Sequence, residues 1–221
     1  MLRFPHDTHT HTVYSDGSGA IADNIAIAED RGLKLLAITD HSHYLGPKTL
    51  NRYVREVRHW AEDSEVRVLV GVEGNITVDG VDVPDWMAKK LDFIIASVHE
   101  WLETPEEYLE LVKAALMDEN VDVIGHFGAN FLYIGFPGTD ELQEIFELAE
   151  ANGKAFEISS RYRVPDVGFV RECIQRGIKL TFASDAHNPR SVGNVEWSEK
   201  AFLKAGGEKG DLLFGEFCEG L

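Results

Sequence analysis

Short apolar runs rich in branched side chains alternate along the chain with longer segments whose apolar residues recur at helical spacing. This alternation is typical of repeated β-α units around a parallel sheet. The short runs predict seven strands, at residues 2–11, 33–39, 66–73, 91–98, 121–125, 154–158 and 178–183. The longer segments predict helices at residues 21–31, 50–60, 106–117, 141–151 and 166–176, with one or two more between 198 and 217.

Two segments lie outside this alternation. Residues 78–83 contain an Asp-Gly pair and predict a small hairpin after the third strand. Residues 127–138 form an unusually aromatic loop, which is interpreted either as a wall beside a substrate or as a surface buried between subunits. The seven units together predict an α/β fold, a distorted, TIM-like (β/α)7 barrel. A length of 221 residues and a hydrophobic content of 44% fit one domain over residues 1–221.

Membrane spans, signal peptides and cysteine pairs bear on the cellular compartment that we expect for this chain. No apolar run approaches the roughly 20 residues that span a bilayer, so no membrane partner is expected. The first predicted strand begins at once and leaves no room for a signal peptide, which indicates a cytoplasmic protein. Cys173 and Cys218 form no Cys-x-x-Cys pair, which argues against a disulfide scaffold or a thiolate zinc site. We expect Cys173 on the inner face of a helix.

The formal net charge is −17, from 38 acidic and 21 basic residues. Such a surface repels a nucleic-acid backbone, and no basic stripe interrupts it. Long nucleic acids are therefore unexpected partners, whereas a small phosphorylated molecule stays compatible with the charge. Assembly into a homo-oligomer is also compatible with the sequence.

The chain carries candidate chemistry where the predicted strands end. His9 and His11 point to the same face of an extended backbone, because side chains alternate there. An isolated His-x-His pair would be read as two surface histidines, so its meaning depends on what converges nearby. Parallel β-α barrels place active sites at the carboxyl ends of their strands. That rim is predicted to collect six imidazoles and three carboxylates, from His9, His11, Asp16, His41, Glu73, His99, His126, Asp185 and His187.

Nine such ligands are too many for one ion and predict a cluster of two or three. Imidazole and carboxylate without thiolate fit zinc, manganese or iron better than calcium. If the cluster holds three divalent ions, the three carboxylates leave a surplus of about three positive charges, which suits a phosphomonoester dianion. Bound ions also lower the pKa of water. The pattern therefore predicts a metal-dependent phosphoesterase that uses a metal-bound hydroxide and needs no Ser or Cys nucleophile.

At these residues the chain resembles the PHP family, named for polymerase and histidinol phosphatase, and within it the small stand-alone phosphoesterases. The matching segments are Asp7-Thr-His-Thr-His11, Ser15-Asp16-Gly17, Thr39-Asp-His41, Gly71-Val-Glu73, Ser97-Val-His99, Gly125-His126 and Ser184-Asp-Ala-His187. The resemblance implies a PHP-type distorted barrel with a trinuclear site.

The resemblance also implies a ligand set for each ion. One ion would be held by His9, His11, Glu73 and Asp185, and Glu73 would bridge to a second ion completed by His99 and His126. A third would be held by Asp16, His41 and His187. Glu73 and Asp185 are thereby also catalytic candidates. Asp7 is not expected to bind an ion and is expected to support the ligands through hydrogen bonds.

Three further residues are candidates for contact with the substrate. Arg161 comes just after the sixth predicted strand, and Arg190 comes just after His187. Each is a candidate for donating paired hydrogen bonds to phosphate oxygens. Surface salt bridges are the alternative for both arginines. His43 is a candidate for protonating the leaving group, with plain packing against the site as its alternative.

Four other functions compete with a phosphomonoesterase. Within the PHP family these are an exonuclease and a nucleotide phosphodiesterase. Amidohydrolases also open with His-x-His on a barrel, but that pattern does not explain Asp16, His41 or Glu73. Non-catalytic, RNA-binding PHP-like subunits have lost their metal ligands, whereas this acidic chain keeps all nine. The sequence does not name the substrate.

Overall fold

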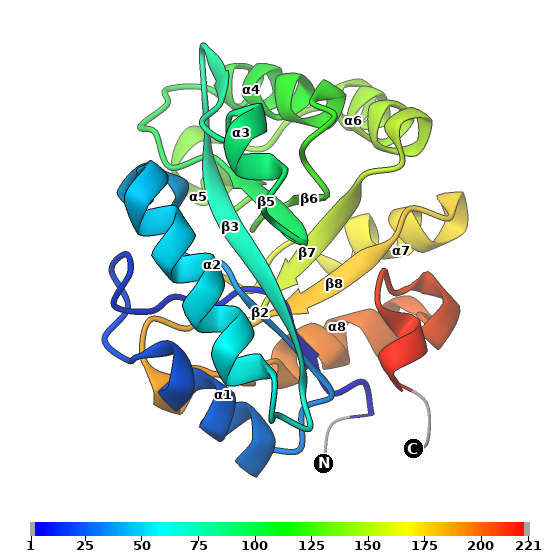
Figure 1. Cartoon of the computed structure of the whole chain (residues 1–221). Coiled ribbons are helices and arrows are strands. Elements are labelled where there is room, and N and C mark those ends of the chain that lie inside the picture. The colour runs from blue at the N-terminus through cyan, green and yellow to red at the C-terminus, as the bar shows by residue number, and fades with distance from the viewer. Residues whose placement is uncertain (1–2, 219–221) are drawn as a thin grey trace.

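The computed structural model describes residues 3–218, and its centre is a single sheet of eight strands (Figure 1). Seven strands are parallel and follow one another around the sheet: β1 (His6–Asp7), β2 (Leu35–Ile38), β3 (Arg67–Thr77), β5 (Phe93–Ser97), β6 (Val123–Ile124), β7 (Ala155–Ser159) and β8 (Leu180–Ala183). The short strand β4 (Gly80–Val81) pairs antiparallel with β3.

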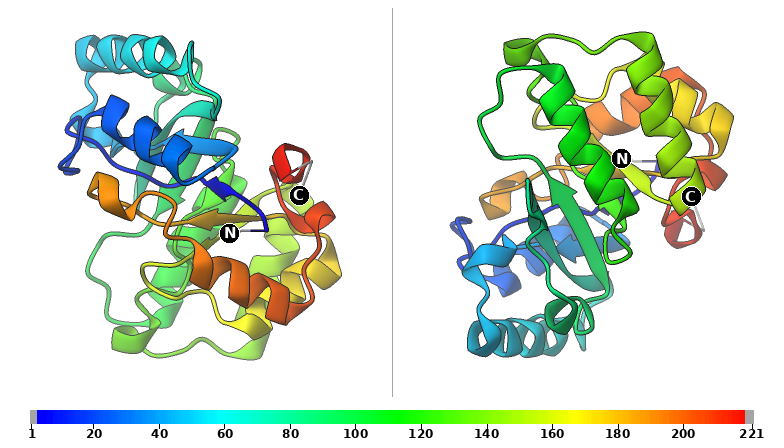
Figure 2. Two further views of the ribbon diagram at one scale, coloured as in Figure 1. Left: turned by 90° about the horizontal axis from the view of Figure 1, so that it is seen from below. Right: turned by 90° about the horizontal axis from the view of Figure 1, so that it is seen from above.

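The two ends of this sheet meet, so that it curls into a nearly closed barrel (Figure 2). The Thr8 N–H donates to the Phe182 carbonyl at 3.0 Å, and the His11 N–H donates to the Ala186 carbonyl at 2.8 Å. These bonds join the chain that follows β1 to β8 and the chain beyond it. The expected distorted barrel of seven parallel strands is confirmed.

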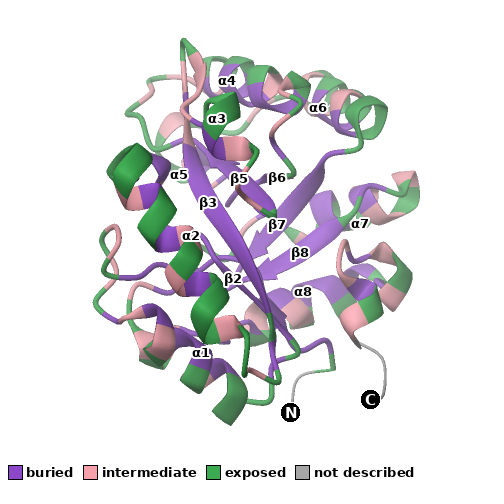
Figure 3. Ribbon diagram, viewed as in Figure 1, coloured by how far each residue is buried: buried purple, intermediate pink, exposed green. Residues whose placement is uncertain are grey.

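Helices surround the barrel and bury its outer face, while their own outward faces stay exposed (Figure 3). The α-helices are α1 (Ile21–Asp30), α2 (Pro47–Ala61), α3 (Asp85–Ala88), α4 (Pro105–Met117), α5 (Phe131–Ile134), α6 (Thr139–Asn152), α7 (Val167–Arg176) and α8 (Glu196–Ala205). Short 3-10 turns are η1 (Ser42–Tyr44), η2 (Pro189–Ser191), η3 (Lys209–Asp211) and η4 (Gly215–Cys218). Side-chain caps begin two helices, because Thr104 accepts the Glu107 N–H of α4 and Asp166 accepts the Gly168 N–H of α7.

The first strand is much shorter than the expected residues 2–11. After β1 two successive backbone donors turn to side chains: the His9 N–H donates to the Asp7 carboxylate and the Thr10 N–H to the Thr39 hydroxyl. A regular ladder needs those N–H groups, so it stops at Asp7 although residues 8–11 remain buried.

The third strand is longer than expected, and the aromatic loop is partly helical. We expected the strand to end at Glu73, but β3 continues to Thr77 because its last residues pair with β4. The predicted hairpin thus begins inside β3, which leaves Glu73 within a strand and not at its end. In the predicted loop 127–138, residues 131–134 form the short helix α5.

Cys173 is fully buried on α7, as expected, and the side chain of Cys218 lies outside the described part of the structure. Among the described residues, no helix has both the length and the apolar character needed to cross a bilayer. The cytoplasmic location stays a prediction.

Candidate metal centre

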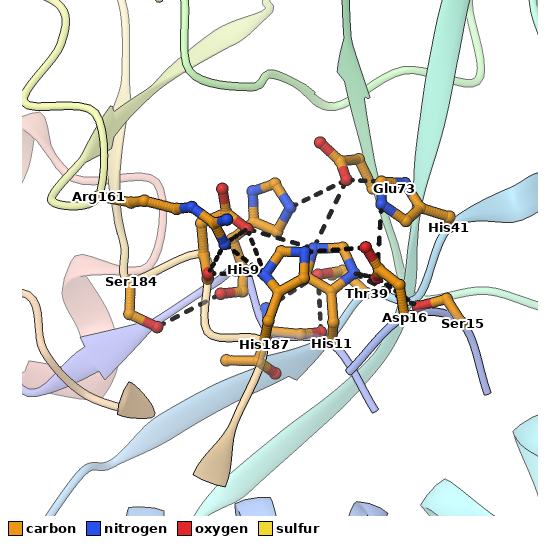
Figure 4. A network of polar contacts seen from close by, with 12 residues as sticks. His9, His11, Ser15, Asp16, Thr39, His41, Glu73, Arg161, Ser184 and His187 are labelled. Carbon is orange, nitrogen blue, oxygen red and sulfur yellow. Dashed lines mark hydrogen bonds and ion pairs between the residues drawn. The ribbon is translucent and has the colours of Figure 1, made fainter. Parts of the chain in front are cut away.

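The structure brings all nine candidate ligands into one continuous cluster that includes the Glu73 carboxylate. Figure 4 labels six of them, His9, His11, Asp16, His41, Glu73 and His187. Glu73 Oε2 faces three imidazoles, with nitrogen–oxygen distances of 3.3 Å to His9 Nε2, 3.5 Å to His11 Nε2 and 3.0 Å to His41 Nδ1. Its other oxygen, Oε1, faces His126 Nε2 at 3.1 Å and His99 Nε2 at 3.3 Å. Glu73 therefore lies between two sets of histidines, with one oxygen directed at each.

Asp16 and Asp185 complete the cluster on the side of His187. Asp16 Oδ2 lies 3.1 Å from His187 Nε2, and Asp16 Oδ1 lies 3.6 Å from His41 Nε2. Asp185 Oδ1 lies 3.4 Å from His11 Nε2 and 3.2 Å from His187 Nδ1. His41 thus contacts Glu73 through one ring nitrogen and Asp16 through the other.

The donor atoms fit divalent metal ions. Three sets each place their ligand atoms within 4.8 Å of one another: His11, Asp16, His41 and His187; His9, His11 and Glu73; and His41, Glu73 and His99. Three ring nitrogens are buried without a hydrogen-bond partner among the described residues: His9 Nε2, His11 Nε2 and His41 Nδ1. Each lies within 3.5 Å of Glu73. Orphaned buried nitrogens are rare in native proteins, and imidazole with carboxylate is a donor set that suits zinc, manganese or iron.

Two supporting residues were absent from the sequence prediction. Glu157 on β7 is fully buried, and its Oε2 lies 2.7 Å from His9 Nδ1. Asn75 Oδ1 lies 2.6 Å from His99 Nδ1. Each oxygen accepts the proton of Nδ1, so that Nε2, on the side of Glu73, is the ring nitrogen available to bind a metal ion. The sequence signal that could have identified Glu157 is a lone carboxylate in an otherwise apolar stretch, residues 155–158.

Asp7 connects β1 to the loop that carries Asp185 and His187. Its Oδ1 accepts the Ser184 N–H at 2.9 Å, and its Oδ2 accepts the Ser184 hydroxyl at 2.6 Å and the Gly193 N–H at 2.7 Å. No ring nitrogen of the cluster is among these partners. The contacts agree with the expectation that Asp7 supports the site from behind.

At the centre of the site, the pKa shifts that burial causes are opposed by the neighbouring charges. Burial raises the pKa of the Glu73 carboxyl, but the imidazoles of His9 and His126 outweigh it and hold that pKa well below its usual range. Burial lowers the pKa of His9, but Glu73 and Glu157 raise it well above the usual value. The field that attracts a proton to His9 also attracts a metal cation, which would take the place of that proton. At His41 burial prevails and lowers the pKa to about 4, so this imidazole is neutral near pH 7.

Of the two candidate phosphate arginines, the structure brings only Arg161 to the cluster. Its guanidinium extends toward His187 (Figure 4), where Nη1 contacts the His187 ring and lies 3.5 Å from Asp185 Oδ1. Arg161 also borders a hollow of about 400 Å³ together with Ser184 and His187. Arg190 is exposed, and its carbonyl accepts a hydrogen bond from Arg31. No described contact joins the Arg190 side chain to the nine ligands.

His43 lines a second hollow, of about 360 Å³, together with His41 and His99. The Asn75 amide lies 3.0 Å from His43 Nδ1. The same amide group donates to Asp82, which orients Asn75 with its nitrogen toward His43 and its oxygen toward His99. His43 Nδ1 is therefore an acceptor, and the proton of the neutral ring resides on Nε2.

Comparison with known proteins agrees with this geometry. The model of the PHP domain family matches residues 7–161. A probable phosphatase of Acetivibrio thermocellus is 32% identical over 215 residues, which cover 88% of this chain and 84% of that protein. The DNA polymerase/3′-5′ exonuclease PolX of Bacillus subtilis is 27% identical, over 94% of this chain but only 38% of its own length. The similarity therefore includes a polymerase-attached protein as well as stand-alone ones.

A solved structure that resembles this chain shares its fold over most of both chains. Histidinol phosphate phosphatase of Lactococcus lactis, solved with zinc, L-histidinol and phosphate, superposes with a TM-score of 0.70 at 19% identity. The match covers 93% of this chain and 95% of that one. At this identity the likeness establishes the fold.

Proposed function

This chain belongs to the PHP domain family, and we propose that it is a metal-dependent phosphatase that hydrolyses small phosphate monoesters. The observation that supports this most directly is Glu73, which is buried between two sets of imidazoles, one of which faces it with three orphaned ring nitrogens. Such a centre concentrates cation-binding groups in a protein whose net charge is −17. Its local positive field, once ions are bound, suits a doubly charged terminal phosphate.

We assign two or three divalent ions to the centre, with zinc, manganese or iron as the candidates. His9, His11, Glu73 and Asp185 would hold the first ion, and Glu73 would share the second with His99 and His126. Asp16, His41 and His187 would hold the third. When bound, the ions supply a water acidified for attack and positive charge for the oxygens of the phosphoryl group.

The chain's own residues perform the remaining steps. Arg161 binds a non-bridging phosphate oxygen from the side of Asp185 and His187. Attack of water forms a new oxygen–phosphorus bond as the bond to the leaving alcohol breaks. The departing alkoxide takes up the proton that the attacking water releases, and His43 donates a hydrogen bond from its Nε2 N–H to that oxygen, with Asn75 fixing the orientation of the ring.

A second candidate is a 3′-5′ exonuclease or nucleotide phosphodiesterase, which the similarity to PolX favours. The acidic surface argues against it, because a long polyanion is repelled before it reaches the centre. The retained ligands likewise argue against a non-catalytic, RNA-binding role, and the match to the PHP domain disfavours an amidohydrolase-type reaction.

A single experiment tests the proposal against this rival. Protein stripped with a chelator and reloaded with zinc or manganese would be assayed on histidinol phosphate, sugar phosphates, nucleoside monophosphates, a bis-aryl phosphodiester and a single-stranded oligonucleotide. We expect metal-dependent phosphate release from monoesters. Degradation of the oligonucleotide without turnover of any monoester would assign the exonuclease activity.

A further inference from the structure

An apolar cavity of about 430 Å³ lies beside the candidate metal centre, over the carboxyl ends of β6 and β7. Three segments build it: residues 127–137, which include α5; Leu142 in the first turn of α6; and residues 162–169, which run from the loop after β7 into α7. The side chains that form its walls include Phe127, Phe131, Leu132, Phe136, Tyr162 and Phe169. Of the described residues lining it, only Arg163 and Asp166 carry charge.

Tyr162 stands between this cavity and the metal centre. Its ring centroid lies 5.0 Å from that of His126, and the same ring lines the cavity. The guanidinium of the preceding residue, Arg161, lies 5.6 Å from the Tyr162 ring and contacts Asp185. A molecule whose phosphate reaches Arg161 therefore has the apolar cavity within reach of its other end.

The cavity walls expose large apolar side chains, which is unusual on the surface of a strongly acidic protein. Leu132 is 80% exposed and Phe136 is 71% exposed, although both are large apolar side chains. Exposed apolar residues that gather around one hollow mark a binding surface. The volume falls within the roughly 300–1,000 Å³ typical of small-molecule sites, and an apolar lining with few polar groups is usual for them.

We propose that this cavity binds the leaving group of the substrate, and that the preferred substrates are phosphate monoesters of alcohols carrying an apolar or aromatic ring. The inference rests on the proposed phosphatase function and adds the substrate class. The phosphate occupies the charged centre, and the alcohol passes Tyr162 into the cavity. Sugars and glycerol offer no apolar surface to match these walls.

The test compares two esters of primary alcohols, 2-phenylethyl phosphate and ethyl phosphate, which differ in the ring. We expect kcat/KM of the metal-loaded wild type to be roughly 10- to 100-fold higher for the phenylethyl ester, the effect of burying one phenyl group. Leu132→Ser and Phe136→Ser should each lower that ratio several-fold. Tyr133→Ser is the matched control, because Tyr133 is 81% exposed on α5 but does not line the cavity.

Calorimetric binding of both esters to the metal-loaded protein separates this inference from the proposed function. If no monoester is hydrolysed, the phosphatase assignment fails, and tighter binding of the phenylethyl ester would still support the cavity. Equal kcat/KM and equal affinity for the two esters in the wild type would overturn the inference. So would a wild type that forms an oligomer together with a Phe136→Ser variant that keeps the ratio but is monomeric, because the surface would then be a subunit interface.

Discussion

His9 and Glu157 form a fully buried pair, with His9 Nδ1 located 2.7 Å from Glu157 Oε2. The carboxylate accepts the Nδ1 proton and thereby aims Nε2 at Glu73, 3.3 Å away. Glu157 is distant in sequence from the His-x-His motif, and among the described contacts it reaches the candidate centre only through His9. Its role is to position a ligand and to make that ligand more basic.

Glu157→Gln is expected to weaken zinc affinity about 10- to 100-fold, because the amide accepts the same hydrogen bond without the negative charge. Competition with a chromophoric chelator measures the affinity. Glu147→Gln, an exposed change on α6, is the matched control. Unaltered zinc affinity in a folded Glu157→Gln protein would show that the pair does not tune the metal.

Glu73→Gln should remove more than one metal ion per chain. One Glu73 oxygen faces His9, His11 and His41, and the other faces His99 and His126. Elemental analysis after loading with zinc or manganese would report the stoichiometry, with Glu103→Gln as an exposed control. A variant that keeps the wild-type metal content and turnover contradicts the bridging role.

Arg161→Ala should lower kcat/KM for a monoester by roughly ten- to a hundredfold, the effect of losing one charge-assisted pair of about 1.5–3 kcal/mol. Metal content should not change. Arg190→Ala is the informative comparison, because Arg190 is exposed and has no described contact with the cluster. A larger loss in Arg190→Ala than in Arg161→Ala would reverse the assignment of the phosphate contact.

Acid should destabilise the fold through His6 on β1. Burial lowers the pKa of His6 to about 3, whereas the unfolded chain takes up a proton near pH 6.5. The unfolded state therefore binds more protons between these values, and stability falls with decreasing pH by up to about 1.4 kcal/mol per unit.

Denaturant unfolding of metal-free protein between pH 7.5 and about 5 would measure this slope. His6→Gln keeps an acceptor for the Phe182 N–H and should reduce the slope, while the exposed change His59→Gln should not. Parallel curves for wild type and His6→Gln would exclude His6 as the source.

The sequence alone determined the barrel and the composition of its rim. The apolar runs and the helical periods can be read directly from the sequence. Parallel strands then bring their carboxyl ends to one edge of the barrel, whatever the exact packing of the side chains. His41, His99 and His126 were predictable for that reason, since each follows a strand. The early end of β1 was not predictable, because it depends on which side chains accept hydrogen bonds from the backbone N–H groups of His9 and Thr10.

The tertiary structure alone decided which residues contact one another across the barrel. Glu157 and Asn75 support His9 and His99 through side-chain hydrogen bonds that no sequence spacing encodes. Arg161 and Arg190 are equivalent in sequence, both following a strand end, yet only Arg161 points at Asp185. The apolar cavity likewise arises where three separate segments pack together. Contacts of this kind depend on distances of a few ångströms between residues far apart in the chain, and only the folded packing sets those distances.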